Sequence, residues 1–405
     1  MLWQLALRNI WRNRRRTLLT LSAMVISSAL LILCLGVFSG MLKDMLASAT
    51  EQYFGHLVIS AKGYQDDRDM FANFPADLDL PALRHPQVTG YSPRLRSFGL
   101  LSFANNSAPV ELLGIRPQHE QQVTSLQDHL QSGRYLREEE RNGAVIGAGL
   151  AKRLAVQPGD ELVFVTQAAD GSIGNDLLQV SGIFSTGDQG HDNSLVLVPL
   201  GWLQQLLVLP GKLHEISLRV EQPRQAAILA GQLTGGMPPE LEVLDWGQML
   251  PEMKEVVASY DVSRMIIVTI LYIATGLGIL NTFFMSVLER TREFGVLMAV
   301  GMRPGQIRLM VLLETLAMGL ISLIFGVGLG VLLSLYMAFV GIDLSGSLTP
   351  ITYAGGTILP RLHAVLETAN ILVPAVVLLL VCLLAGFLPA NRAARMQPVV
   401  AIREE

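Results

Sequence analysis

The sequence predicts a membrane protein with four transmembrane α-helices and a large α+β extracytoplasmic domain inserted between helices 1 and 2. The 405 residues are 51% hydrophobic and only 16% charged, and the mean hydropathy of +0.43 is high for a soluble protein. Part of the chain therefore belongs in lipid. Three patterns separate the membrane-spanning segments from the rest of the chain: long charge-free runs, clustered arginines, and one long segment with strand-like alternation.

Four charge-free runs are long enough to cross a bilayer, because a helix needs roughly 20 apolar residues to span a hydrocarbon core of roughly 30 Å. They are Thr17–Leu42, Met265–Leu288, Thr315–Ile342 and Thr368–Asn391. The first run could instead be a secretory signal peptide, since basic residues precede it and Ala47-Ser48-Ala49 resembles a cleavage site. Its length exceeds the roughly 7–15 apolar residues of a signal, which favours an uncleaved helix.

Arginine placement predicts the orientation, because positive charge collects in cytoplasmic segments. Arginines precede the first run, separate the second from the third, and follow the fourth: Arg8, Arg12, Arg14, Arg15, Arg16, Arg290, Arg292, Arg303, Arg308, Arg392, Arg395 and Arg403. The segments Lys43–Arg264 and Asp343–Glu367 are then extracytoplasmic. Both termini are predicted to be cytoplasmic.

The first of these outer segments has the pattern of a folded α+β domain. His56–Tyr64 alternates like a strand, and Leu100–Ile115 reads as two strands around an Asn-Asn-Ser turn. Gly143–Val165 reads as a strand, a short helix and a further strand. Cys34 and Cys382 both fall inside apolar runs, so we expect an apolar core rather than disulfides to stabilise this domain.

The ends of the domain have helical composition. Lys43–Phe54 and Pro251–Met265 continue the first and second runs without a break. We expect them to extend these helices as a rigid stalk. The alternative is that each helix frays at the membrane surface and a flexible linker carries the domain.

The sequence lacks the motifs of catalysis. It contains no GxxxxGK[ST], GxSxG, HExxH or CxxC pattern. Only Asp188–Asp192, "DQGHD", places a histidine among carboxylates, where a metal is conceivable but a solvated polar turn is the favoured interpretation. We expect no catalytic residue, no metal site and no cofactor in this chain.

A few residues in the apolar runs are candidates for helix packing. Asn281 is expected to bond a neighbouring helix, and Glu314 to pair with Arg308 or another basic group at the interface. Gly326 and Gly330 have the GxxxG spacing that permits close approach of helices, with a dimer contact as the alternative.

The segment between the second and third runs reads "ERTREFGVLMAVGMRPGQI" over residues 289–307. Phe294, Leu297 and Met298 are spaced as one face of a helix. Gly301 suits the helix end and Pro304 the start of the next helix. The pattern predicts an amphipathic helix on the cytoplasmic membrane surface, either anchored there without a partner or serving as a docking site.

Four stretches carry a resemblance to a known family: "LALRNIWRNRRRTLLTLSAMV", "GHLVISAKGY", "GILNTFFMSVLERTREFGVLMAVGMRPGQI" and "PANRAARMQPVVAIREE". The chain resembles the permeases that include the membrane subunits of lipoprotein-releasing transporters, the macrolide exporter MacB and the division-associated permease FtsX. The resemblance implies a mechanotransmission-type (type VII) ABC permease. In that family, the first cytoplasmic loop is a coupling helix that docks on an ATP-binding subunit.

The resemblance also divides the chain. It implies a cytoplasmic basic segment (1–16), the first span with its stalk (17–55), a periplasmic domain (56–250), a stalk with the second span (251–288), the coupling helix (289–303), the third span (304–342), a periplasmic loop (343–367), the fourth span (368–391) and a cytoplasmic tail (392–405). The coupling residues it implies are Glu289, Arg290, Arg292, Glu293, Phe294, Leu297, Gly301 and Pro304.

The implied partners are two copies of an ATP-binding subunit, which bind ATP and Mg²⁺, a second permease copy, membrane lipid, and a lipoprotein or other periplasmic protein, with no nucleic acid. Unlike the macrolide exporter, this sequence has no fused ATPase, and unlike FtsX-like members its outer domain is large. The expected location is the bacterial inner membrane. Lipoprotein release or sorting, or transport of a hydrophobic cargo, is the favoured function; the alternatives are macrolide or peptide efflux through an adaptor, and regulation of a periplasmic hydrolase.

Overall fold

The structure is a computed structural model that describes residues 14–348, 350–353, 356–358 and 360–396. It divides into two compact units. The first, the membrane unit, comprises Met1–Leu42, Ala258–Gly346 and Arg361–Glu405, and the second, the outer unit, comprises Lys43–Val257 and Ser347–Pro360.

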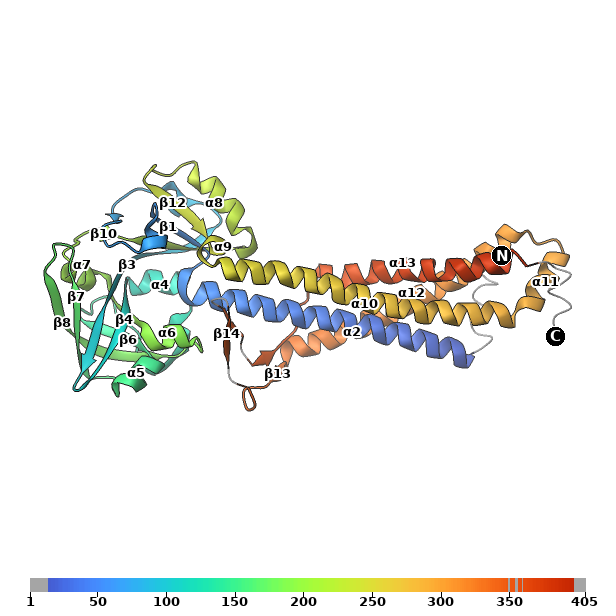
Figure 1. The fold of residues 1–405 in the computed structure, drawn as a ribbon, viewed down its shortest axis with the longest axis horizontal. Helices are drawn as coiled ribbons and strands as arrows, with labels where there is room; N and C mark the ends of the chain where they lie inside the picture. Colours follow the sequence, from blue (N-terminus) through green and yellow to red (C-terminus); the bar gives the residue numbers. More distant parts are fainter. Residues whose placement is uncertain (1–13, 349, 354–355, 359, 397–405) are drawn as a thin grey trace. The chain divides into compact units, whose positions relative to one another are not determined.

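Four long helices run alongside one another in the membrane unit (Figure 1). They are α2 (Arg14–Ala49), α10 (Pro251–Glu289), α12 (Pro304–Phe339) and α13 (Thr368–Ala394). Each is long and apolar enough to cross a membrane, as predicted. The third helix begins well before the charge-free run that predicted it, because Pro304 occupies its first turn, and Gly341 follows its end with a φ of +65°.

The remaining elements of this unit are short. The helix α11 (Thr291–Ala299) separates α10 from α12. Between α12 and α13, β13 (Ile342–Asp343) pairs with β16 (Arg361–Leu362).

All four long helices contribute side chains to one apolar core, which includes Leu31, Tyr272, Met318 and Leu378. Small residues bring these helices close together. A Cβ added at Gly326 would lie 2.9 Å from the Cβ of Ser28, and one at Gly330 would lie 2.9 Å from the Cβ of Ile32. The GxxxG face of α12 therefore packs against α2 of the same chain.

Asn281 lies on the exposed side of α10. The prediction that it packs against a neighbouring helix is therefore wrong for the helices of this chain. Periodicity alone did not show which side of α10 faces its neighbours.

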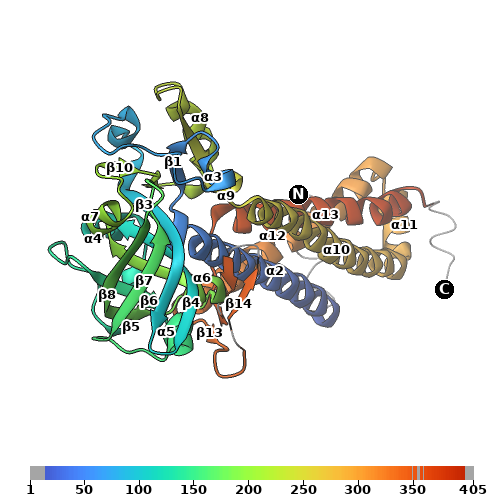
Figure 2. The same ribbon diagram turned by 60° about the vertical axis from the view of Figure 1, so that its left-hand side comes forward.

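Six strands of the outer unit form a closed ring, here called the barrel (Figure 2). Each strand hydrogen-bonds to the next, and the last returns to the first. In ring order they are β3 (Val88–Phe103), β4 (Asn106–Ile115), β9 (Leu195–Pro199), β6 (Gly143–Gly147), β8 (Ile173–Phe184) and β7 (Glu161–Gln167). Buried side chains such as Leu101, Ile146 and Phe164 belong to the large apolar core of this unit.

A smaller antiparallel sheet adjoins the barrel. It contains β12 (Leu241–Asp245), β1 (Leu57–Ala61) and β11 (Glu215–Val220), and β11 pairs with the first half of β3. The long strand β3 thus belongs to both halves: Val88–Arg94 pairs with β11, whereas Leu95–Phe103 pairs with β4.

Short elements complete the outer unit. The helices are α3 (Tyr64–Asp67), α4 (Pro117–Val123), α5 (Ala148–Leu154), α6 (Gln189–Ser194), α7 (Leu200–Leu206), α8 (Ala226–Thr234) and α9 (Trp246–Met249). The strands are β2 (Phe74–Pro75), which pairs with β10 (Lys212–Leu213), and β5 (Leu130–Gly133), which pairs with β8. The short 3₁₀ helices are η2 (Pro81–Arg84), η3 (Leu126–His129) and η4 (Pro223–Gln225).

The strand predictions are confirmed for Leu100–Ile115 and Gly143–Val165. The turn of the β3–β4 hairpin falls earlier than expected, since Phe103 pairs with Asn106 and leaves Ala104 and Asn105 in the turn. Ala104 has a φ of +48° there.

The stalk segments are helical, as expected. The helix α2 is unbroken to Ala49 and continues as the π-helix η1 (Thr50–Phe54). In the outer unit, Met45 and Met253 pack in one apolar cluster.

A hairpin of β14 (Ile351–Tyr353) and β15 (Gly356–Ile358), here called the strap, packs on this cluster. The hydroxyl of Ser48 donates to the carbonyl of Thr357 over 3.1 Å and accepts from its N–H over 2.8 Å. A Cβ at Gly356 would lie only 2.7 Å from the carbonyl oxygen of Met45. The strap therefore fits the stalk only with glycine at this position.

Candidate functional site

Arg290 fixes the start of α11. Its Nη1 donates to Oε2 of Glu314 on α12 over 2.8 Å, and its Nε donates to Oε2 of Glu293 over 3.2 Å. Its guanidinium also lies 5.0 Å from the ring centroid of Phe294. The side chains of Arg290 and Glu314 are only 15% and 7% exposed. Arg290 therefore positions α11, and its predicted contact with a partner stays a prediction.

Glu314 thus pairs with Arg290, a basic group other than Arg308, as the second form of the prediction allowed. Arg308 instead donates from Nη1 to Oδ1 of Asn391 on α13 over 3.2 Å. The sequence spacing suggested the nearer arginine, but the turn that precedes α11 brings Arg290 back onto α12.

Phe294 is fully buried, so the prediction that it contacts an ATPase is wrong. It lies in an apolar cluster with Val287, Ile307 and Met310, and Leu297 packs against the same cluster. The apolar side of α11 predicted from helical spacing is therefore occupied by α10, α12 and α13. A partner cannot reach Phe294 without unfolding this packing.

Exposed residues on α11 and at its two ends form a different set, here called the outward stripe: Glu289 at the end of α10, Arg292 and Val296 on α11, and Val300 directly after it. Arg292, Val296 and Val300 recur every four positions, as one face of a helix does. Val296 and Val300 are 47% and 83% exposed. Sequence reasoning did not select these two valines; their spacing from Arg292 was the signal that could have found them.

A hollow of about 630 Å³ lies beside the stripe. It is lined by Glu289, Arg290, Arg292, Glu293, Val296, Leu297 and Met310. Five of the predicted coupling residues thus line one concavity. Its mixture of both charges with apolar side chains is suited to recognition of a protein surface.

The two predicted boundary residues lie beyond the helix. Gly301 has a φ of +102°, and its N–H donates to the carbonyl of Met298 over 3.0 Å. Pro304 is the first residue of α12. Both residues shape the turn that follows α11 rather than its exposed surface.

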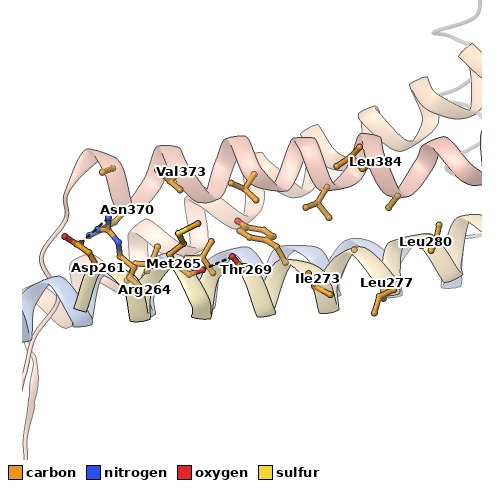
Figure 3. A pocket seen from close by; sticks show the side chains of 18 of the residues that line it. Asp261, Arg264, Met265, Thr269, Ile273, Leu277, Leu280, Asn370, Val373 and Leu384 are labelled. Carbon is orange, nitrogen blue, oxygen red and sulfur yellow. Dashed lines mark hydrogen bonds and ion pairs between the residues drawn. The ribbon is translucent and has the colours of Figure 1, made fainter. Parts of the chain in front are cut away.

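A second concavity runs between α10 and α13 within the membrane unit (Figure 3). It has a volume of about 750 Å³. Its walls are mainly apolar, with Ile273 and Val373 among them, and only Asp261 and Arg264 are charged among the described lining residues. These two lie together at one end of the groove (Figure 3), with 3.6 Å between Arg264 Nη2 and Asp261 Oδ1. The groove therefore offers no continuous row of charged groups along the helices.

The "DQGHD" segment is a short helix rather than a solvated turn. Asp188 caps α6 by accepting from the N–H of Gly190 over 2.7 Å. Asp192 is buried and accepts from the N–H of Thr186 over 2.9 Å. Both carboxylates thus stabilise the local fold, and no group of three potential metal-binding side chains occurs in the described part of the chain.

Comparison with known proteins identifies both parts of the chain. Residues 17–235 match the family model described as MacB-like periplasmic core domain, and residues 265–398 match the one described as FtsX-like permease C-terminal. The first match covers most of α2 and the outer unit as far as α8, and the second covers most of α10 together with α11, α12 and α13.

Several curated proteins are similar. LolE, a lipoprotein-releasing system transmembrane protein of Haemophilus influenzae, is 25% identical over 78% of this chain and 77% of its own length. The corresponding protein LolC of Xylella fastidiosa is 26% identical over 93% of this chain and 90% of its own length. The macrolide export ATP-binding/permease protein MacB of Acinetobacter baylyi is 24% identical over 100% of this chain, which spans 59% of MacB.

Proposed function

The chain belongs to the family of MacB-like and FtsX-like ABC-transporter permeases, and on that premise we propose that it transmits ATP-driven motion from a separate ATP-binding subunit to its extracytoplasmic domain. The observation that carries this proposal is the outward stripe of α11. A short helix held by the Arg290–Glu314 ion pair and by buried Phe294 presents both charged and apolar side chains to a partner. A rigidly held helix is suited to transmitting force.

The assembly in this proposal contains two ATP-binding subunits, which bind ATP and Mg²⁺, and a second permease copy. ATPase domains close in pairs, whereas one chain supplies one coupling helix. The arginine clusters support cytoplasmic termini and a cytoplasmic α11 in a bacterial inner membrane. The mainly apolar groove between α10 and α13 supports action on the outer side rather than passage of a hydrophilic cargo through the spans.

The favoured cargo is a lipoprotein, released from the membrane or sorted at its outer surface. The similarity to LolE and LolC supports this choice, since it extends over most of both chains in each comparison. Efflux of a macrolide or peptide through a periplasmic adaptor is the second candidate. It is supported by the match to MacB, which covers all of this chain.

The coupling proposal is tested by charge reversal on the outward stripe. Arg292→Glu combined with Val296→Asp should abolish stimulation of the co-purified ATPase in proteoliposomes, while the chain still inserts into the membrane. Arg395→Glu, an exposed arginine beyond α13, is the matched control and should leave stimulation intact. Equal stimulation by the stripe variant and the wild-type chain would contradict the assignment.

The cargo is tested by purification from the native membrane in mild detergent followed by mass spectrometry. Co-purified lipoproteins with an ATPase support lipoprotein release. An adaptor protein with an ATPase and no lipoprotein supports efflux, and a cell-wall hydrolase in their place contradicts both transport functions.

A further inference from the structure

Charged side chains, most of them buried, lie together in the outer unit where β3 passes from the smaller sheet to the barrel. We call this group the ionic network: Arg68, Arg94, Arg96, Glu111, Glu120 and Glu215. The side chains of Arg94, Glu120 and Glu215 are 0% exposed, and that of Arg96 is 1% exposed. Three positive and three negative charges balance one another.

The contacts within the network are short and directional. Arg94 forms a two-pronged pair with Glu120, with Nη2 to Oε1 at 2.5 Å and Nε to Oε2 at 3.0 Å. Arg96 donates from Nη2 to Oε1 of Glu215 over 2.6 Å and also pairs with Glu111. Planar guanidinium groups match carboxylates best in such geometry.

The network joins the two halves of the outer unit. Arg94 and Arg96 lie on β3, the strand that both halves share. Glu215 lies on β11 of the smaller sheet, and Glu111 lies on β4 of the barrel. Arg96 therefore bonds one carboxylate from each half.

The end of the stalk enters the same network. Nη1 of Arg94 donates to the backbone carbonyl of Tyr53 in η1 over 2.7 Å. The hydroxyl of Tyr53 donates to Oε1 of Glu111 over 2.7 Å and accepts from Nη1 of Arg96 over 2.6 Å. Carbonyls at a helix end lack partners within the helix, so Arg94 supplies one.

Backbone contacts fix the stalk end further. Gly55 has a φ of +75°, and a Cβ there would lie 2.8 Å from the carbonyl oxygen of Leu218 on β11. The N–H of Ser125 donates to the carbonyl of Glu51 over 2.8 Å, and the side chain of Glu51 pairs with Arg219 at 3.1 Å. The stalk end thus meets the sheet without room for a side chain at Gly55.

Stability alone does not account for so many buried charges. Removal of charges from water offsets most of their attraction, so apolar replacements of a buried pair are often equally stable. Burial alone would raise the pKa of Glu215, but Arg96, Arg68 and Arg94 hold that pKa well below its usual range. Glu215 therefore stays ionised near neutral pH, and its ion pairs with the three arginines permit only a narrow set of geometries.

We propose that Arg94 and Arg96 are positioning residues that form a pivot, through which the stalk end at Tyr53 sets the orientation of the barrel relative to the smaller sheet. This inference rests on the proposed function, because it names the point where motion of the first span enters the outer domain. Displacement of η1 moves the Tyr53 carbonyl and hydroxyl, and the two arginines transmit that displacement to β11 and β4.

The test uses the full chain with its co-purified ATPase in lipid nanodiscs. Spin labels are placed at two exposed positions, Lys152→Cys on α5 beside the barrel and Gln232→Cys on α8 beside the sheet, after Cys34→Ala and Cys382→Ala. Double electron–electron resonance then measures the distribution of distances between the two spin labels, first without nucleotide and then with ATP and vanadate. Circular dichroism checks that each variant is folded.

The decisive variant combines Arg94→Met with Glu120→Gln, which keeps the network neutral and retains an acceptor for the Ser92 hydroxyl. We expect a broader distribution without nucleotide and loss of the shift with ATP and vanadate, at unchanged basal ATPase activity. The matched control is Arg134→Met with Glu140→Gln, which removes an ion pair beside β5 and β6 and should change neither measurement.

Tyr53→Phe keeps the proposal testable if the double variant does not fold. It removes only the hydroxyl between Glu111 and Arg96, and we expect a smaller broadening in the same direction. A wild-type distribution in both variants overturns the pivot. If ATP and vanadate cause no shift of the distance distribution in the wild-type chain, the proposed function is overturned instead. The width of the distribution without nucleotide still tests the pivot in that case.

Discussion

The guanidinium of Arg290 and the carboxylate of Glu314 approach within 2.8 Å and join the start of α11 to α12. Because both groups are largely buried, Glu314→Ala leaves a buried positive charge and should cost about 3 kcal/mol. Arg290→Met with Glu314→Met should cost less than either single change. Thermal unfolding in detergent, arranged as a double-mutant cycle, measures the coupling; additive single effects would show that the pair acts as two independent groups.

Substitutions of Phe294 on α11 and of Val300 directly after it should differ strongly in their effect on stability. Phe294→Ala removes a fully buried ring and should destabilise the membrane unit by about 3–5 kcal/mol. Val300→Ala, at a position 83% exposed, should change stability by less than about 0.5 kcal/mol. If thermal unfolding shows comparable losses for both, the assignment of inward and outward sides of α11 is wrong.

Alanine substitutions of Gly330 and Gly328 test the contact between α2 and α12. A Cβ at Gly330 would lie 2.9 Å from the Cβ of Ile32, so Gly330→Ala should destabilise the helix packing by about 1–3 kcal/mol. A Cβ at Gly328 meets no heavy atom within 4 Å, so Gly328→Ala should be neutral or slightly stabilising. Thermal unfolding of the two variants in the same detergent makes the comparison.

His56 makes the stability of the outer unit depend on pH. Burial, and then the charge of Arg219, lowers the pKa of His56 from 6.5 to about 4. The unfolded chain therefore takes up a proton below pH 6.5 while the folded chain does not, so stability is lost as pH falls from 6.5 towards 4. The pKa of His214 is also lowered by burial and acts in the same direction.

Between pH 4.5 and 6.5 the contributions of His56 and His214 are separate from those of the buried carboxylates. The carboxylates Glu111 and Glu215 have lowered pKa values and lose their contribution only below 4.5. In this window His56→Gln should reduce the dependence of the free energy of unfolding on pH. Denaturant titrations followed by tryptophan fluorescence measure that free energy at each pH. An unchanged slope would assign the effect to other groups.

Local patterns predicted the elements that local physics determines. The four apolar helices follow from hydropathy and length, and the β3–β4 hairpin follows from alternation around a short turn. The helix at α11 follows from its spacing, but its orientation does not. Both sides of that helix carry apolar residues, and only the packing of α10, α12 and α13 decides that Phe294 is buried and Val300 is not.

The ionic network shows the limit of sequence reasoning more sharply. Arg94 and Arg96 lie in a strand pattern where charged residues usually face water, and their partners Glu120 and Glu215 are distant in the chain. Nothing near the arginines in sequence marks them as buried. Closure of the barrel through β7 and β3 is equally non-local, because it depends on pairing between segments that the sequence does not place together.

The strap has a consequence for the order in which the protein assembles during synthesis. The strands of the barrel and the smaller sheet all lie within Leu57–Asp245, so they can pair as soon as that stretch has crossed the membrane. Domains generally fold from the N-terminus as the chain emerges. The cluster around Met45 and Met253 is different, because Ile358 joins it only after the third span has been made and its following loop exported. Completion of the stalk is therefore a late step in biogenesis. A chain arrested before the strap would have a folded outer domain but a stalk cluster that lacks Ile358.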